Sequence, residues 1–144
     1  MIDLVTTEEM HDITNARLEW AKALRSGFYR QAKGQLIKDN GNGTYGFCCI
    51  GVATLHFAGM DALQRHVHEN SGYDGGFNCQ MPKEVENKLG LTFDSRSQLA
   101  TYNDRDGVTF DFIATLIERN ADKQPSDFLH GIVTTATTLH PDSL

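Results

Sequence analysis

The sequence predicts a single α+β domain that is mainly helical and contains one small β-hairpin. Apolar residues recur at helical spacing in several segments that end at glycine or begin at proline. Two short strand-like segments flank a turn with two Asn-Gly steps. The 144 residues are 40% hydrophobic and 22% charged, which is the size and balance of one globular domain spanning residues 1–144.

The N-terminal segment is expected to form a long helix. Thr6 and Glu9 have the spacing of a capping box, in which each side chain bonds the other residue's backbone N–H. The apolar-biased pattern that follows continues to about Ser26, and Gly27 is a natural stop. The predicted core begins with this helix, at about residue 7, and runs to about residue 120.

A hairpin and a buried helix are expected next. Residues 35–38 and 44–47 are the two strands, since the Asn-Gly steps between them favour a tight turn. Residues 49–58 are apolar nearly all round, as in a central helix, and Gly59 closes it. Residues 61–78 lack a clear apolar period and contain several glycines, so we expect a surface excursion or loop there.

Short helices are expected in the C-terminal half. Pro82 is placed to open one that ends at Gly90, residues 95–102 form another turn of helix, and Thr109 caps a strong amphipathic helix over residues 110–120. Residues 121–144 have only a weak apolar set. They predict either a docking helix or a frayed end.

Charge and cysteine content exclude several classes of partner. The net charge is −6 and the 13 lysines and arginines are scattered, which argues against duplex nucleic acid. No apolar run is long enough for a membrane span, and no signal-peptide pattern follows Met1. Three cysteines, two of them adjacent, fit a reducing cytoplasm better than a disulfide framework. No cofactor is expected, and the sequence leaves the oligomeric state open, a homo-oligomer included.

The adjacent thiols of Cys48 and Cys49 are the first candidate site. At a helix N-terminus the free N–H groups can stabilise a thiolate, so either cysteine could be the nucleophile of a small hydrolase. No histidine lies in a recognisable partner motif, and Ile50, Gly51 and Val52 indicate close packing. We therefore expect the pair to be mainly structural.

A zinc site is a weaker hypothesis. Structural zinc sites use ligand pairs two to four residues apart, which adjacent cysteines do not provide. His66 and His68 could provide one such pair if the backbone of their segment were extended. We expect no metal. The residues considered are Cys48, Cys49, Cys79, His56, His66 and His68.

Aromatic and polar residues form the third candidate site, for a nucleotide-type ligand. Aromatic faces can stack on a purine, amides and guanidinium groups can hydrogen-bond it, and cations can hold its phosphate. The alternative is that these residues form core and turns. The candidates are Trp20, Tyr29, Arg30, Gln31, Lys33, Asn103, Asp104 and Arg105; the densest cationic stretch, which could serve one small anion, is Lys22, Arg25, Arg30, Lys33 and Lys38.

A further pattern is the order of a set of residues over about positions 17–118. The set is Trp20, Ala23–Leu24, Ser26–Gly27, Tyr29, Gln31, Gly34, Leu36, Cys48–Cys49, Gly51–Val52, Pro82, Val85, Leu89–Leu91, Leu99, Asn103–Asp104, Phe110, Ile113–Ala114 and Ile117–Glu118. This order resembles a family of small proteins encoded by tailed bacteriophages. The family's cysteine run usually reads Cys-Cys-Leu-Gly-Val, so Ile50 is a mild departure, and Met81 replaces a common leucine. Both substitutions keep apolar volume.

The resemblance implies a phage origin but no catalytic residues. We therefore expect an accessory protein that acts by binding in the cytoplasm of the infected bacterium and counteracts host defence. Its target would be a nucleotide-type signal, sequestered near Tyr29, Arg30, Gln31 and Asn103, or a host protein engaged by the acidic surface or the histidine-containing segment. The alternative is a hydrolase with Cys48 or Cys49 as nucleophile.

Overall fold

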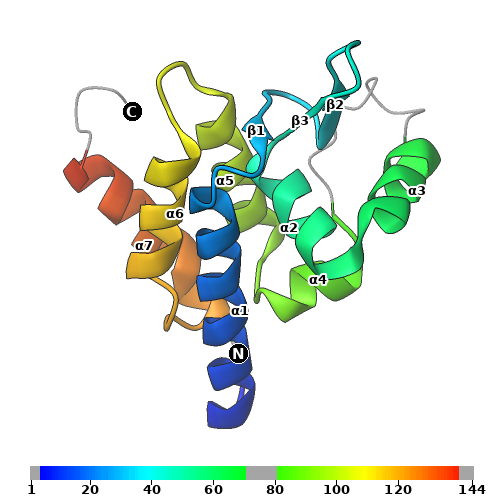
Figure 1. Ribbon diagram of the computed structural model, residues 1–144. Coiled ribbons are helices and arrows are strands. Elements are labelled where there is room, and N and C mark those ends of the chain that lie inside the picture. Colours follow the sequence, from blue (N-terminus) through cyan, green and yellow to red (C-terminus); the bar gives the residue numbers. More distant parts are fainter. Residues whose placement is uncertain (1–3, 71–80, 140–144) are drawn as a thin grey trace.

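The computed structural model describes residues 4–70 and 81–139, in which helices pack together with one small sheet (Figure 1). The α+β, mainly helical class predicted from the sequence is confirmed. The elements are α1 (Thr7–Arg25), β1 (Arg30–Gln31), β2 (Ile37–Asp39), β3 (Tyr45–Phe47), α2 (Cys49–Ala58), α3 (Met60–Asn70), α4 (Lys83–Lys88), α5 (Phe93–Asp104), α6 (Phe110–Arg119) and α7 (Pro125–Leu139).

The sheet has the strand order β1-β3-β2 and lies at one end of the molecule (Figure 1). Strands β2 and β3 are antiparallel, which confirms the hairpin, and the Asn40 N–H donates to Thr44 O at 3.0 Å across the turn. Strand β1 pairs with β3 in parallel. This third strand was not predicted, because a two-residue strand paired with a distant segment has no periodicity of its own.

Helix α1 crosses the middle of the molecule and packs against α6. Its predicted capping box is present: Thr6 Oγ1 accepts from Glu9 N at 3.1 Å, and Glu9 Oε1 accepts from Thr6 N at 3.2 Å. The buried face includes Ile13, Trp20 and Leu24, in the 3–4 residue spacing of an amphipathic helix. This face anchors the core.

Arg17 is buried on the same face of α1, with none of its surface exposed. Its guanidinium donates to four backbone oxygens: Leu89 O at 2.8 Å, Gly90 O at 3.0 Å, Ala121 O at 3.0 Å and Lys123 O at 2.6 Å. It also lies 4.0 Å from the centre of the Phe128 ring. Burial lowers the pKa of Arg17 to about 10, and Asp122 opposes this shift. One side chain thus joins α1 to two loops and to α7.

Helix α2 is central, as predicted. It begins after Cys48, whose Sγ accepts from Gly51 N at 3.3 Å, and ends at Gly59. Gly51 lies against the backbone of Leu36: a Cβ at position 51 would be 1.9 Å from Leu36 O. Only glycine therefore lets the loop before β2 pass this close to α2.

The expectation of an excursion over residues 61–78 was wrong for residues 61–70, which belong to helix α3. Met60, Leu63 and Val67 follow helical spacing; Leu63 is fully buried and the other two pack against the core. Three apolar residues suffice because only one face of α3 is turned to the rest of the molecule, where it packs against α2 and β2. Residues 71–78 lie outside the described part of the chain.

The remaining helices extend the predicted ones. Pro82 is the N-cap of α4 rather than its first residue, and a capping box of Thr92 and Ser95 starts α5 two residues before the expected position. Thr109 caps α6 as predicted. Residues 125–139 form helix α7, whose Phe128 and Ile132 are fully buried, so the core continues beyond residue 120. No helix within the described ranges is both long and apolar enough to cross a bilayer.

Candidate functional site

Two cations flank a glycine on the outward face of the sheet. Arg30 of β1 and Lys38 of β2 both have Gly46 of β3 as their register partner, so the three residues form one row across the strands. Side chains in such a row project from the same face. The next row contains Phe47, which is buried in the core, and therefore the row with Arg30 and Lys38 faces solvent.

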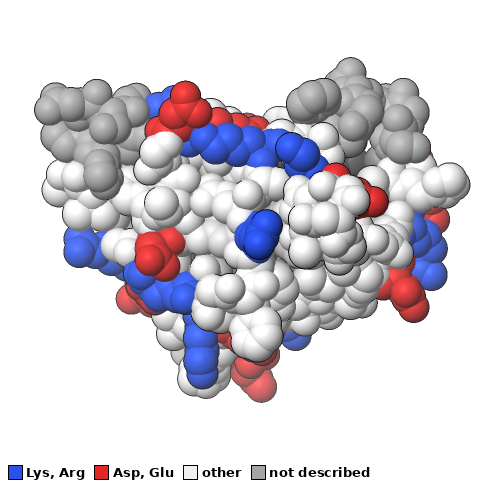
Figure 2. Space-filling view, turned by 45° about the horizontal axis from the view of Figure 1, so that its top comes forward, with Lys and Arg blue, Asp and Glu red and all other residues white. Residues whose placement is uncertain are grey.

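This row lines a surface hollow of about 480 Å³. Gly46 contributes no side chain between Arg30 and Lys38, and it is buried beside Ala32. Both Arg30 and Lys38 are exposed, and none of the ion pairs found among residues 4–70 and 81–139 involves either of them. Figure 2 shows lysine and arginine side chains gathered across the top of the molecule, on the side where the sheet lies.

Lys33 lies at the same hollow and is held toward the loop after α5. Its Nζ donates to Arg105 O at 3.0 Å and to Asp106 Oδ1 at 3.1 Å. Asp106 therefore partly neutralises Lys33. The cations best placed to meet an external anion are Arg30 and Lys38, with the Asn40 side chain beside them.

Asn103 of α5 holds the sheet in place from the core side and is fully buried. Its Oδ1 accepts from Cys49 N at 3.1 Å and from Gln31 Nε2 at 3.2 Å, while its Nδ2 donates to Ala32 O at 2.8 Å. Gln31 Nε2 also donates to Val108 O at 3.0 Å. The amides of Gln31 and Asn103 are thus committed to the fold, and they position β1 with Arg30 beside Gly46.

Replacing Asn103 by leucine is expected to lower the free energy of unfolding by about 2–3 kcal/mol, because a side chain of similar size would leave buried partners on three segments unpaired. Urea unfolding measures the change. Asn15→Leu is the control, since Asn15 is exposed on α1. A loss below about 1 kcal/mol, the net value of a single ordinary hydrogen bond, would contradict this role.

The other two predicted polar residues, Asp104 and Arg105, make contacts at the C-terminal end of α5. Asp104 Oδ1 accepts from Gly34 N at 2.7 Å, and the Arg105 guanidinium lies 5.7 Å from the centre of the Tyr102 ring. Burial raises the pKa of Tyr102, and Arg105 opposes this shift. Gln31, Lys33, Asn103, Asp104 and Arg105 are therefore brought together, as a network that supports the hollow.

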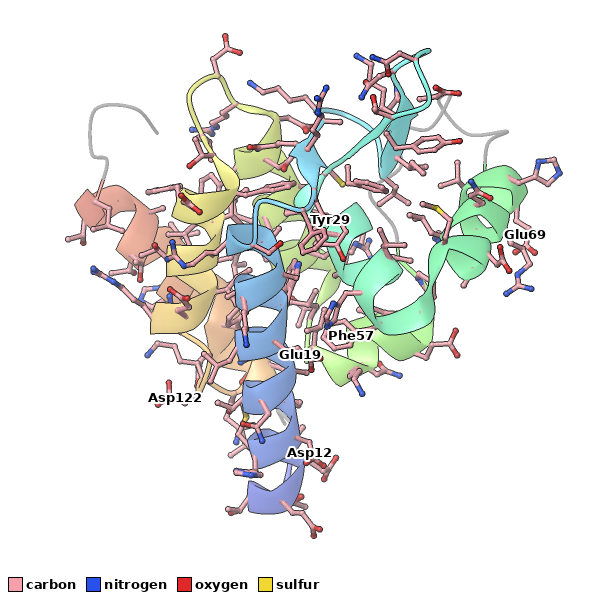
Figure 3. The ribbon with its side chains drawn as sticks, viewed as in Figure 1. Asp12, Glu19, Tyr29, Phe57, Glu69 and Asp122 are labelled. Carbon is pink, nitrogen blue, oxygen red and sulfur yellow. The ribbon has the colours of Figure 1, made fainter. Side chains whose placement is uncertain are left out.

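Trp20 and Tyr29 do not lie at this hollow. Trp20 is fully buried and its Nε1 donates to Cys49 O at 3.0 Å, so its ring offers no face to a ligand. Tyr29 is half-buried and meets Phe47 edge-on, with ring centres 5.8 Å apart. It lines a separate hollow of about 300 Å³ with Glu19 and His56. Figure 3 shows Tyr29 and Glu19 on the side of the molecule where α1 faces α2.

Lys22 and Arg25, from the same cationic stretch of sequence, lie on α1 away from the sheet hollow. Arg25 donates to Glu118 through two nitrogens, at 3.0 and 2.7 Å, and this hydrogen bonding lowers the pKa of Glu118. Its charge is therefore engaged by α6. Of the five cations in the stretch, the structure places Arg30, Lys33 and Lys38 together.

Both candidate nucleophiles are buried: Cys48 is 1% exposed and Cys49 is 0% exposed. Cys48 Sγ caps α2, and Cys49 Sγ donates to Leu99 O at 3.6 Å. A substrate would have to open the core to reach either sulfur. Their burial supports the structural interpretation of the pair.

The histidines considered for zinc occupy separate positions on α2 and α3. His56 Nε2 lies 2.8 Å from Glu19 Oε1, and His66 and His68 belong to helix α3 rather than an extended segment. Cys79 lies outside the described residues. Among the residues that are described, no three histidine, cysteine or acidic side chains gather as a metal site would require.

Three residues that line the hollow, Ala32, Asn40 and Gly46, belonged neither to the predicted ligand site nor to the cationic stretch. The sequence did contain a signal for Gly46, because the hairpin register places Lys38 opposite it. The pairing of Arg30 with the same glycine depends on the parallel strand, which the sequence did not indicate.

A comparison with known protein families identifies a family for this chain. A family model described as a domain of unknown function, DUF8296, matches residues 13–97, which is more than half of the chain. The matched part includes all three strands and therefore the row of Arg30, Gly46 and Lys38. No curated protein and no solved structure matches significantly. The match supplies a family but no activity.

Proposed function

Because the chain belongs to the DUF8296 family of domains of unknown function, we propose a function from its own geometry: it binds a small anionic ligand of nucleotide type on the outward face of its sheet. The observation that carries the proposal is the pair of cations, Arg30 and Lys38, on either side of Gly46. Two exposed cations on one face of a sheet are suited to phosphate oxygens.

The hydrogen bonds beneath the sheet support a preformed binding site. Asn103 and Gln31 fix the backbone of β1, so the backbone of Arg30 is already beside Gly46 before a ligand arrives, which lowers the entropy cost of binding. The burial of Cys48 and Cys49 leaves the hydrolase alternative without an accessible nucleophile. The net charge of −6 makes a local cationic row more selective for a small anion than for a long polyanion.

The biological setting of the proposal is the cytoplasm of an infected bacterium. The resemblance of residues 17–118 to tailed-phage proteins supports a phage accessory protein, and a protein that binds a nucleotide tightly without converting it would withdraw that signal from host defence. Engagement of a host protein is the second candidate target.

A thermal-shift assay with a panel of linear and cyclic nucleotides tests the proposal. At least one nucleotide is expected to raise the melting temperature, since a ligand present at about 100 times its Kd adds about 2.7 kcal/mol to stability. Arg30→Ala is expected to abolish the increase. Arg119→Ala is the matched control, because it removes an exposed arginine from α6.

Two outcomes would count against the proposal. If no nucleotide stabilises the protein at millimolar concentration, nucleotide binding is rejected and a host protein becomes the favoured target. If Arg119→Ala reduces the stabilisation as much as Arg30→Ala does, the effect comes from overall charge and not from the sheet.

A further inference from the structure

The turn between β2 and β3 contains two Asn-Gly steps, Asn40-Gly41 and Asn42-Gly43, at the outer end of the hairpin (Figure 1). All four residues are exposed. In an Asn-Gly step the backbone nitrogen of the glycine can attack the side-chain carbonyl carbon of the asparagine, because glycine has no Cβ to shield that nitrogen. The two steps have different hydrogen-bond partners, so we expect their reactivities to differ.

The attacking nitrogen is restrained in the first step but not in the second. Gly41 N–H donates to Asp39 Oδ1 at 2.8 Å, whereas Gly43 N–H has no acceptor among the described residues. The nitrogen has to lose its proton to attack, and a carboxylate beside it disfavours the negative charge that would remain. Asp39 therefore protects Asn40 from the reaction.

The carbonyl group under attack also differs between the two steps. Asn42 Oδ1 accepts from Thr44 Oγ1 at 2.5 Å and from Thr44 N at 3.2 Å. Asn40 instead uses its nitrogen, with Nδ2 donating to Thr44 Oγ1 at 3.3 Å. Attack on the amide carbon places negative charge on the amide oxygen, so the two donors at Asn42 stabilise the intermediate as an oxyanion hole does.

We propose that Asn42 is a site of spontaneous deamidation and that it reacts faster than Asn40 in the folded chain. Gly43 N forms a bond to Asn42 Cγ and loses its proton, while the bond from Cγ to the side-chain nitrogen breaks, so that ammonia leaves and a cyclic imide remains. Water then opens the imide at either carbonyl group and gives aspartate or isoaspartate. Either product adds a negative charge to the hairpin that carries Lys38. The inference is independent of the proposed function.

Peptide mass spectrometry of the full chain, incubated folded near neutral pH, tests the inference, because fragmentation assigns each conversion to position 40 or 42. Conversion is expected to be about tenfold faster at Asn42 than at Asn40. This ratio is below the roughly hundredfold effect of one oxyanion donor in an enclosed site, because the turn is exposed to water. The same chain in denaturing urea is the matched control, since both steps lose their contacts there and should react at similar rates.

Two substitutions separate the two causes. Thr44→Val keeps the branched shape and the backbone donor but removes the hydroxyl donor, so it should slow conversion at Asn42 several-fold. Asp39→Ala should accelerate conversion at Asn40, because Gly41 N–H loses its acceptor. Circular dichroism spectra show whether both variants are folded.

Equal rates at the two asparagines in the folded chain, or faster conversion at Asn40, would overturn the inference. So would an Asn42 that stays intact in the folded chain although it converts in urea, because the hydrogen bonds from Thr44 would then restrain the side chain rather than activate it. An unchanged rate in Thr44→Val would overturn it as well, since the hydroxyl group is the donor on which the preference for Asn42 depends.

Discussion

Replacing Arg17 by methionine is expected to lower the free energy of unfolding by about 3–5 kcal/mol, because each buried acceptor left unpaired costs about 1–3 kcal/mol and the relief of no longer burying a charge offsets part of the total. Methionine fills much of the volume but donates no hydrogen bond, so the oxygens of Leu89, Gly90, Ala121 and Lys123 lose their donor. Chemical denaturation measures the loss. The melting temperature should fall by about 10 °C or more.

Lys22→Met is the matched control for this substitution. Lys22 lies on the same helix but on its exposed face, so a loss specific to Arg17 cannot come from charge or helix propensity. Arg17→Lys should recover little of the stability, because one ammonium group cannot reach oxygens on both loops as the guanidinium fork does. A loss below about 1 kcal/mol in Arg17→Met would contradict the assigned role, since it would equal one ordinary hydrogen bond.

Gly51→Ala is expected to prevent stable folding, or to cost more than about 3 kcal/mol, through overpacking in the centre of the fold. The added Cβ would lie 1.9 Å from Leu36 O and 2.8 Å from Leu36 C. These are backbone atoms, so they cannot move away by changing a rotamer. Either α2 or the segment leading into β2 must shift. The readout is the yield of soluble protein and the midpoint of urea unfolding.

Gly27→Ala separates this steric effect from the general cost of replacing glycine. Gly27 follows α1 with φ of +79° and has open space around its Cβ position. Alanine there should cost about 1–2 kcal/mol from the backbone conformation alone. If Gly51→Ala is no more destabilising than Gly27→Ala, the close approach of Leu36 to α2 is not a packing constraint.

Local signals in the sequence predicted most of the helices and the hairpin. The capping box at Thr6 and Glu9, the turn of Asn-Gly steps and the cap at Thr109 each depend on residues three or four positions apart, so they can be read without knowing the fold. Helix α3 was missed because polar residues outnumber Met60, Leu63 and Val67, although their spacing was helical.

The features that were not predicted depend on distant contacts. Strand β1 exists only because residues 30–31 meet β3, and Arg17 is buried only because two loops bring four carbonyl groups to it. Arg17 did carry a signal: it follows Ile13 by four residues and precedes Trp20 by three, on the apolar face of α1. A charged residue in that position must find buried partners.

Only part of the candidate site could be predicted, because the rest of it also depends on contacts between distant segments. The sequence grouped Arg30 and Lys33 with ligand-binding amides, but burial and hydrogen bonds commit Gln31 and Asn103 to the fold. Trp20 could be interpreted as a stacking platform or as core from its residue type, and only its burial distinguishes the two. The row across Gly46 required the register of both strand pairs.

The central claim is that the outward face of the sheet binds a phosphate-bearing ligand. An NMR titration of the ¹⁵N-labelled full chain with sodium pyrophosphate tests it most directly. The largest chemical-shift changes are expected at the backbone amides of residues 30–33, 38–40 and 46, and they should disappear in Arg30→Ala. The claim would be contradicted if the amide shifts stayed unchanged at millimolar pyrophosphate, or if the changes clustered at the separate hollow beside Tyr29 and His56.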